Sequence, residues 1–233
     1  MTNCLEVKDL QLSIRNKPIL QDITFAVPNG KIMALVGHNG AGKSTTMKAI
    51  MGWQDKDEGE ISIQGIQQDK HFLRYKTQFS YIPEEPLLMS ELTVYQHFQL
   101  YGASYQIEED LLNERVEYYT KEFEIQDKLS EFPESLSKGM RQKVQTICAL
   151  LPEVPLLLID EPFMGLDIYA AQFLIEELKN RKEQGTAILL TTHQLEKVTD
   201  LCDYYVLLSN GVISESGEIE AFSGLQRREV HDE

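Results

Sequence analysis

The stretch GHNGAGKST at residues 37–45 constrains the fold of this 233-residue chain more than any other feature. It satisfies the pattern G-x-x-x-x-G-K-[ST], whose glycines let the backbone curl so that its N–H groups point at phosphate oxygens. The apolar run KIMALVG (31–37) precedes it, as a buried strand would, and the segment KSTTMKAIMG is predicted to be a helix that ends at Gly52. A strand, a glycine-rich loop and a helix in this order predict a site for a phosphate chain.

Each part of this loop has an expected role. Lys43 would reach the β- and γ-phosphates of a nucleotide, and the Ser44 hydroxyl would ligate Mg²⁺. The positive end of the helix dipole adds attraction for an anion. The residues predicted to surround the phosphates are Gly37, His38, Asn39, Gly40, Ala41, Gly42, Lys43, Ser44 and Thr45.

The segment LLLIDEP (156–162) supplies a second element of the same chemistry. An aspartate at the end of a buried strand, Asp160, can hold Mg²⁺ opposite Ser44. Glu161 would then lie near the γ-phosphate, where a carboxylate can polarise a water, and a general base of this kind contributes roughly 10²–10⁴-fold to a rate. The alternative is a strand-end acidic pair that only caps a helix.

Two other segments are weaker signals when each is taken alone. SLSKGMRQK (135–143) places Ser137 and Gly139 at the start of a helix, which suits a second anion site, although a capped helix start explains it equally well. LLTTHQ ends a strand with His193, which can donate a hydrogen bond to a γ-phosphate or position the water. For an isolated histidine of this kind, a structural role is the favoured interpretation.

The pattern of the whole chain predicts an α/β protein. Helical spacing begins near Pro86 and indicates an inserted helical block, and the last third alternates strands and helices, which predicts a mainly parallel sheet. Asn210-Gly211 marks a hairpin turn, and residues 194–202 are predicted to be a helix. The predicted strands of the first third lie at 5–14, 19–27, 31–37, 59–65 and 77–82.

Composition argues against several classes of protein. The net charge of −15 weighs against a nucleic-acid partner, because such binding depends on Lys and Arg that neutralise phosphates. Three widely spaced cysteines, Cys4, Cys148 and Cys202, do not suggest a disulfide framework or a zinc site. The longest apolar run is far too short to span a bilayer, so we expect any membrane role to come through a partner.

Taken in this order, these motifs resemble the ATP-binding cassette (ABC) ATPases over nearly the whole chain. LSKGMRQ is similar to the family signature, with Ser137, Lys138, Gly139 and Met140 at its centre, and His193 corresponds to the switch histidine. The D-loop of the family corresponds to Gly165, Leu166 and Asp167. The segments YIPEEPLLMSELTVYQHFQLYG and FPESLSKGMRQKV are most similar to the ATPase subunits of Ecs-type exporters.

The resemblance implies an ATPase that uses ATP and Mg²⁺. Glu161 and His193 would be catalytic, residues 37–45 would bind ATP, and the metal ligands would be Ser44, Glu84 and Asp160. Two cassettes would meet head to tail, so that the signature of one chain contacts the ATP held by the other. The implied fold is a P-loop NTPase (RecA-like) core with a mainly parallel sheet, an N-terminal antiparallel β subdomain and an inserted α-helical subdomain.

The implied organisation is a single nucleotide-binding domain over residues 1–225. The α/β core with its antiparallel subdomain takes 1–86 and 153–225, the helical subdomain takes 87–152, and 226–233 form a frayed tail. The expected partners are a separate membrane-spanning permease and a second nucleotide-binding subunit, expected to be a copy of this chain, with no nucleic acid. The expected place is the cytoplasmic face of the cell membrane, as a peripheral subunit that is soluble when isolated.

The sequence departs from the family pattern at three positions. Glu84 stands where a glutamine is usual, and it would add charge beside the γ-phosphate. Ile14 takes the place of an aromatic residue that stacks on adenine, and Met164 precedes the D-loop where a small residue is common. A missing stacking contact is worth on the order of 1 kcal/mol.

Two alternative functions stay open from the sequence. A cassette ATPase that acts on nucleic acid or ribosomes would have a basic surface and often two cassettes in one chain. A nucleotide-gated switch without turnover would have no use for Glu161 as a base. The leading hypothesis is a transport ATPase, and only the resemblance favours export.

Overall fold

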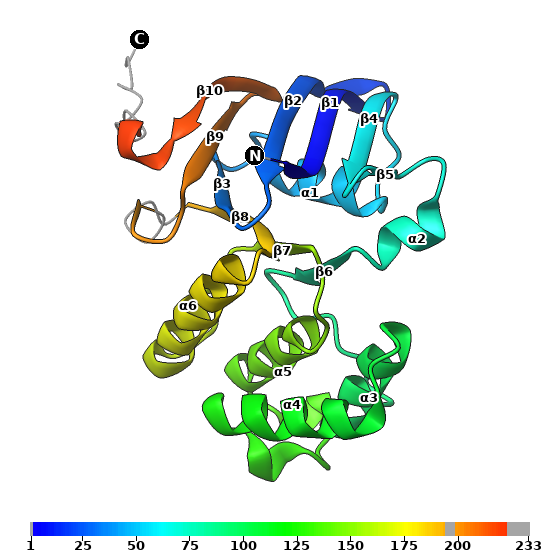
Figure 1. The fold of residues 1–233 in the computed structure, drawn as a ribbon, viewed down its shortest axis with the longest axis vertical. Coiled ribbons are helices and arrows are strands. Elements are labelled where there is room, and N and C mark those ends of the chain that lie inside the picture. The colour runs from blue at the N-terminus through cyan, green and yellow to red at the C-terminus, as the bar shows by residue number, and fades with distance from the viewer. Residues whose placement is uncertain (1, 194–198, 223–233) are drawn as a thin grey trace.

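The main sheet has six strands and is mainly parallel (Figure 1). The computed structural model describes residues 2–193 and 199–222. In the order β10-β9-β3-β8-β7-β6, neighbouring strands are parallel except β10 against β9. The strands are β3 (Ile32–Val36), β6 (Phe79–Ile82), β7 (Leu156–Asp160), β8 (Ala187–Thr192), β9 (Tyr204–Ser209) and β10 (Val212–Glu218).

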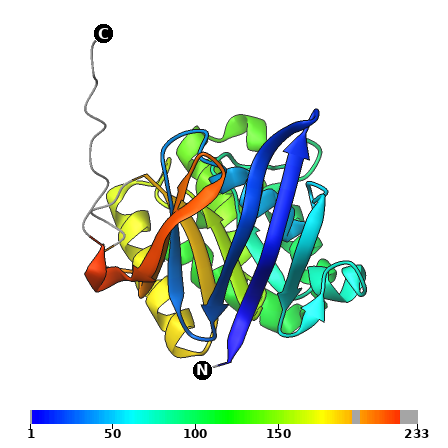
Figure 2. The ribbon, with the colours of Figure 1, turned by 90° about the horizontal axis from the view of Figure 1, so that it is seen from above.

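A second, antiparallel sheet lies over the first and has the order β2-β1-β4-β5. Figure 2 shows β1 and β2 crossing in front of the parallel strands. The turn between them uses Arg15 and Asn16 at φ values of 52° and 60°, which fits the right-handed twist of a hairpin. The four strands are β1 (Asn3–Ile14), β2 (Lys17–Pro28), β4 (Glu58–Ile63) and β5 (Ile66–Gln67).

Three helices gather at the end of the molecule away from the antiparallel sheet, at the bottom of Figure 1. They are α3 (Val94–Ser104), α4 (Glu109–Glu122) and α5 (Lys138–Leu150). At the start of α3, Thr93 and Gln96 form a reciprocal capping box. The other helices are α1 (Lys43–Met51), α2 (Phe72–Lys76), α6 (Ile168–Glu183) and the short 3₁₀ helices η1 (Gln126–Lys128), η2 (Pro133–Ser135) and η3 (Ile219–Ala221).

The two faces of the parallel sheet pack against different layers. One core contains Leu35, Leu158 and Leu189, together with apolar residues of α1 and of the antiparallel sheet. The opposite core includes Leu157 and Ile188 and the apolar side chains of α3 to α6. Because successive side chains of a strand alternate between faces, every second residue of β7 and β8 faces α1. This alternation decides which strand-end side chains face the phosphate loop.

The predicted fold class is confirmed, whereas several short elements were missed. The α/β class with a mainly parallel sheet, an antiparallel N-terminal sheet and an inserted helical block is present. Sequence patterning missed the two-residue strand β5 and the five-residue helix α2, which are too short to show a period. Most of the helix predicted at 194–202, and all of the predicted tail at 226–233, lie outside the described residues.

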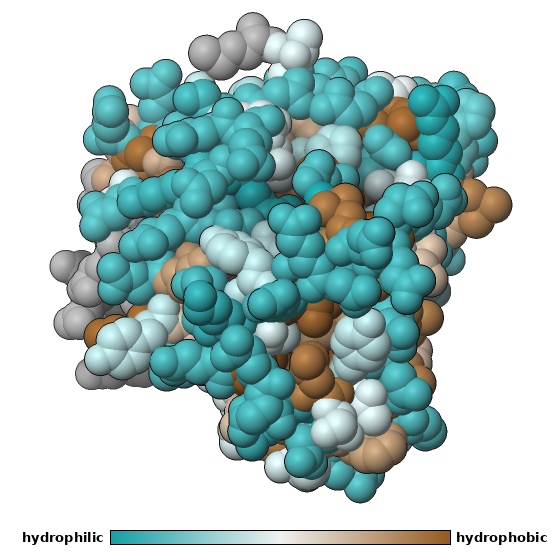
Figure 3. Space-filling view, turned by 60° about the horizontal axis from the view of Figure 1, so that its bottom comes forward, coloured by the Kyte–Doolittle hydropathy of each residue, from teal (hydrophilic) through white to brown (hydrophobic). Residues whose placement is uncertain are grey.

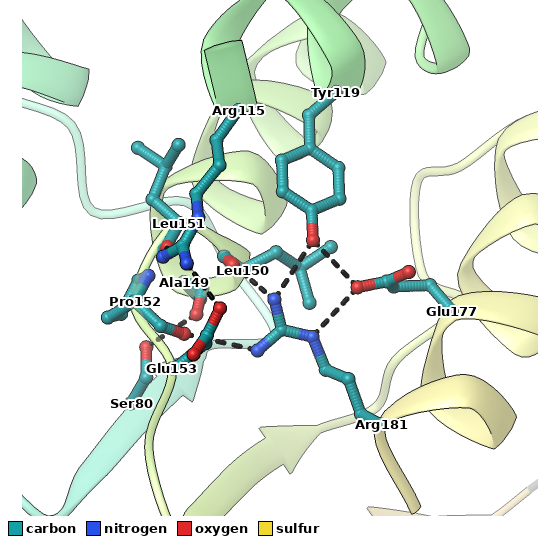
Figure 4. A network of polar contacts seen from close by, with 10 residues as sticks. All are labelled: Ser80, Arg115, Tyr119, Ala149, Leu150, Leu151, Pro152, Glu153, Glu177 and Arg181. Atoms are coloured by element: carbon teal, nitrogen blue, oxygen red, sulfur yellow. Dashed lines mark hydrogen bonds and ion pairs between the residues drawn. The ribbon is translucent and has the colours of Figure 1, made fainter. Parts of the chain in front are cut away.

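A buried polar network joins α4, α6 and the chain that leaves α5 (Figure 4). Arg181 donates from Nε to Glu177 Oε1 at 2.8 Å, and also donates to the Tyr119 hydroxyl and to the carbonyl oxygens of Leu150 and Pro152. The Tyr119 hydroxyl donates to the same Glu177 oxygen at 2.7 Å, and burial raises the pKa of Tyr119 to about 12. The network therefore ties the helical block to a helix of the core.

We expect Glu177→Ala to destabilise the fold by about 3–5 kcal/mol, because it leaves the buried guanidinium of Arg181 without its carboxylate. For a chain of this size that corresponds to a fall in Tm on the order of 10 °C. The matched control is Glu176→Ala, which removes an exposed carboxylate from the same helix. Equal melting temperatures for the two variants, measured by circular dichroism, would contradict the network's role.

Candidate active site

The glycine-rich loop joins β3 to α1, and its glycines are required by geometry. Gly40 and Gly42 have φ values of 80° and 113°, in the region that side chains rarely adopt. A Cβ added at Gly37 would lie 2.5 Å from the carbonyl oxygen of Leu208 on β9. Strand packing and backbone curvature therefore select glycine along this loop.

Lys43 folds back into the curl of its own loop. Its Nζ donates to the carbonyl oxygen of Gly37 at 2.8 Å and lies 3.4 Å from that of His38, and the residue is only 9% exposed. The His38 carbonyl also accepts from the Ala41 N–H at 3.1 Å, which tightens the turn. The loop thus holds one positive charge at the point where a phosphate would enter.

A cavity of about 370 Å³ opens at this loop. Ile14 at the end of β1 and Ile19 on β2 form its apolar side, so Ile14 lies where an adenine-stacking residue was expected. A branched aliphatic side chain has no ring to stack on a base. The lining residues are Ile14, Ile19, Asn39, Gly40, Gly42, Lys43, Ser44 and Thr45. A hollow of about 400 Å³ beside the end of α1 is slightly larger, but no residue of the phosphate loop lines it.

Asp160 lies at the carboxyl end of β7 and is 7% exposed. It continues the series of β7 residues that face α1, the helix that carries Ser44 near its start. Burial raises the pKa of Tyr81 on β6, and Asp160 and the charge of Glu84 raise it further. Glu84 follows β6, which pairs in parallel with β7, the strand that ends at Asp160. Asp160 and Glu84 therefore lie at the same edge of the sheet.

The donor set at this edge fits Mg²⁺. A hydroxyl and carboxylates are the hard oxygen ligands that this ion prefers, and Mg²⁺ usually takes only one or two carboxylates beside phosphates and waters. Glu84 is exposed on the segment that follows β6, and Ser44 is exposed at the start of α1. Over residues 2–193 and 199–222, no three His, Cys, Asp or Glu side chains form a metal-binding group.

Glu161 and His193 are brought together although 32 positions separate them in sequence. Glu161 Oε1 lies 2.7 Å from His193 Nδ1; the carboxylate is buried, whereas the imidazole is 55% exposed. Glu161 has a φ of 51°, a left-handed conformation that a residue other than glycine adopts at a cost. Such strain at a buried carboxylate is typical of a functional position.

The signature segment lies at the N-terminus of α5. The Ser137 side chain accepts the N–H of Met140 at 3.2 Å, so the predicted serine cap is confirmed. A Cβ added at Gly139 would lie 2.9 Å from the carbonyl oxygen of Gly165, and Met140 and Leu166 both pack on the same core. The signature and the predicted D-loop are therefore neighbours in space.

Two ion pairs connect these segments to their surroundings. Lys143 Nζ lies 2.6 Å from Asp167 Oδ2, and the N–H of Ala170 together with this ammonium holds the pKa of Asp167 below its ordinary value. Lys138 Nζ lies 2.6 Å from Glu85 Oε1, next to Glu84 in the chain.

Sequence analysis missed three polar side chains that organise the site. Gln142 donates to the carbonyl oxygen of Pro83 at 3.0 Å, and Gln145 accepts from the N–H of Leu87 at 2.9 Å, so that α5 holds the segment that carries Glu84. Thr191, on β8, contacts both Asp160 and Glu161. The sequence feature that could have identified them is a polar residue among apolar ones, in a buried strand or on the buried face of a helix.

A parallel sheet with a lysine-bearing glycine loop after one strand and a buried Asp-Glu pair after another defines a P-loop NTPase. The family model described as ABC transporter matches residues 20–164. The chain belongs to this family, and as a member it is an ATPase that binds ATP.

Known relatives and solved structures support this membership. The chain is 38% identical over 215 residues to the ABC-type transporter ATP-binding protein EcsA of Bacillus subtilis, covering 92% of this chain and 87% of that protein. It is 31% identical to the SkfA peptide export ATP-binding protein SkfE of the same organism, covering 94% and 90%. A solved ATP-binding subunit of an ABC transporter superposes with a TM-score of 0.91 at 43% identity, covering 94% of this chain and 91% of that chain. The expected similarity to Ecs-type ATPases is confirmed.

Proposed function

We propose that this chain hydrolyses Mg²⁺-ATP to drive a separate membrane-spanning permease. The observation that carries the proposal is the buried Glu161 carboxylate, held 2.7 Å from His193 and directly after Asp160. A nucleotide-gated switch has no need of a carboxylate at this position. A base that must accept a proton from water does need one.

The site residues divide into three proposed roles. The loop at 37–45 binds the phosphates, with Lys43 exchanging its carbonyl partners for phosphate oxygens. Ser44, Asp160 and Glu84 would hold Mg²⁺, which when bound would neutralise charge on the phosphates. Glu161 takes a proton from the attacking water, and His193 orients Glu161 and contacts the γ-phosphate.

We propose that the working unit contains two cassettes. The cavity at the phosphate loop is lined by residues of β1, β2 and the loop itself, and none of its lining residues belongs to the signature. Ser137, Lys138, Gly139 and Met140 lie at the N-terminus of α5, which Figure 1 shows well below α1. A second subunit, a copy of this chain, would bring its signature to this cavity, with residues 165–167 at the contact.

We propose that the permease docks on the helical block, which would place this chain at the cytoplasmic face of the membrane. None of the described helices combines the length and the apolar character needed to cross a bilayer. Large apolar side chains reach the surface at the start of the block, where Leu87 is 60% and Met89 is 53% exposed. Figure 3 shows apolar side chains scattered between polar ones on the face that includes the helical end.

We propose export as the direction of transport, and this proposal rests on the relatives alone. SkfE, whose name describes peptide export, aligns with 94% of this chain. The relatives named above are all transporter ATP-binding proteins, so they do not favour the alternative of an ATPase that acts on nucleic acid or ribosomes.

The division of the chain into a core (1–86 with 153–225) and a helical subdomain (87–152) stays a prediction, consistent with the positions of α3 to α5.

The proposed partnership is tested by co-purification of the tagged full chain from detergent-solubilised membranes. We expect to recover a protein with several membrane spans together with this chain, and we expect ATP turnover that requires Mg²⁺. The matched sample carries Leu87→Ser and Met89→Ser, which should lower recovery of the partner without changing the ATP affinity of the isolated chain. Recovery of ribosomal RNA in place of a membrane protein would refute the transport assignment.

A further inference from the structure

Thr191 is a polar residue in one of the most buried strands of the protein. It is fully buried on β8, where its register partners are Leu35 on β3 and Asp160 on β7. Register partners in a parallel ladder point to the same face, so Thr191 and Asp160 lie side by side toward α1. A valine would fill this place equally well by shape, so the hydroxyl calls for a separate explanation.

The Thr191 hydroxyl both donates and accepts a hydrogen bond. As a donor it bonds to Asp160 Oδ1, and as an acceptor it lies 3.2 Å from the N–H of Glu161. The same N–H lies 3.2 Å from the Thr191 carbonyl oxygen. Because a hydroxyl has a single proton to donate, its orientation is set by Asp160.

These contacts act on the two carboxylates in different ways. The bond to Oδ1 of Asp160 stops rotation of that carboxylate and leaves Oδ2 as the oxygen available to a cation. The bonds to the Glu161 N–H support a backbone whose φ of 51° persists only when its surroundings determine it. One side chain therefore orients the proposed Mg²⁺ ligand and the proposed general base.

We propose that Thr191 is a positioning residue for the ATPase reaction, which couples the orientation of Asp160 to the backbone conformation of Glu161. This inference rests on the proposed function. It does not involve the phosphate loop, because within residues 2–193 and 199–222 the Thr191 side chain hydrogen-bonds to Asp160 and Glu161 and not to that loop. Removal of the Thr191 hydroxyl is therefore expected to reduce turnover and the Mg²⁺-dependent part of ATP binding. ATP binding without Mg²⁺ is expected to be retained.

The test compares three variants of the full chain. Thr191→Val keeps the shape and removes the hydroxyl, whereas Thr191→Ser keeps the hydroxyl and removes a methyl group. Thr146→Val is the matched control, because the buried Thr146 hydroxyl on α5 has no hydrogen-bond partner among the described residues. ATP affinity is measured by calorimetry with Mg²⁺ and with EDTA, together with kcat and Tm.

We expect Thr191→Val to lower kcat by about 10- to 100-fold. The increase in ATP affinity that Mg²⁺ causes should fall by a similar factor, which is typical when a group that orients a metal ligand is removed. Its ATP affinity in EDTA should equal that of the unchanged protein. Thr191→Ser should restore most of both losses, and Thr146→Val should show neither.

Three results would overturn the inference. One is a Thr191→Val protein with unchanged Mg²⁺ dependence and kcat. Another is equal loss of ATP affinity with and without Mg²⁺, accompanied by a lower Tm, because that pattern indicates general structural damage. The third is failure of Thr191→Ser to recover. Failure of the proposed function would appear differently, as an unchanged protein that binds ATP but neither responds to Mg²⁺ nor hydrolyses it.

Discussion

Glu161→Gln is expected to lower ATP turnover by about 10²–10⁴-fold while leaving ATP binding intact. Glutamine has the same size, so it can keep the position 2.7 Å from His193, but an amide oxygen cannot take a proton from water as a carboxylate does. The phosphate loop lies on a different strand connection and keeps its contacts. Measurement of kcat and of ATP affinity in the same preparation separates the two effects.

The variant should also accumulate as a pair of cassettes in the presence of ATP. If both signatures close on bound ATP and hydrolysis opens them, a protein that binds without hydrolysis stays closed. Size-exclusion chromatography with and without ATP shows this directly. Glu183→Gln, at the exposed end of α6, is the control and should behave as the unchanged protein. Turnover by Glu161→Gln equal to that of the control would end the general-base assignment.

Lys43→Ala is expected to weaken ATP binding by about 10- to 100-fold and to lower turnover with it. A hydrogen bond to a charged group contributes about 1.5–3 kcal/mol, and Lys43 is the residue of the loop that carries a full positive charge. The ammonium already lies within the loop, 2.8 Å from the Gly37 carbonyl oxygen, so binding requires little reorganisation of its stem. Calorimetry in EDTA isolates this effect from that of Mg²⁺.

The control for this experiment is Lys48→Ala, which removes an exposed lysine from the last turn of the same helix. It changes the net charge by the same amount and lies away from the phosphate loop. Equal ATP affinities for the two variants would show that overall charge, and not the position of Lys43, attracts the nucleotide. A lower affinity for Lys43→Ala alone supports the loop as the phosphate site.

The effects of the two variants also distinguish binding from chemistry. Lys43→Ala should mainly lower the affinity for ATP, whereas Glu161→Gln should mainly lower kcat. Suppose that Glu161→Gln weakened ATP binding as strongly as Lys43→Ala. Residue 161, with its strained backbone, would then stabilise the phosphate loop and would not act on the attacking water.

Local chemistry explains which features the sequence alone could predict. The phosphate loop occupies nine consecutive residues, so its glycines, lysine and serine could be assigned without knowing any distant contact. The caps at Thr93 and Ser137 are equally local, since each side chain bonds a backbone N–H three residues ahead. The alternation of predicted strands with predicted helices along the chain likewise indicated the α/β class, because apolar runs and helical spacing are local patterns.

Contacts between segments that are distant in sequence could be identified only from the tertiary structure. The pairing of Glu161 with His193, and of Asp160 with Thr191, depends on the register of β7 against β8, which packing of the whole sheet selects. The ion pair between Lys138 and Glu85 likewise depends on how α5 docks. Sequence by itself determined which chemistry the chain carries, because motifs are local. Tertiary structure decided which groups meet, because a shift of one residue in strand register would turn Thr191 to the opposite face of the sheet.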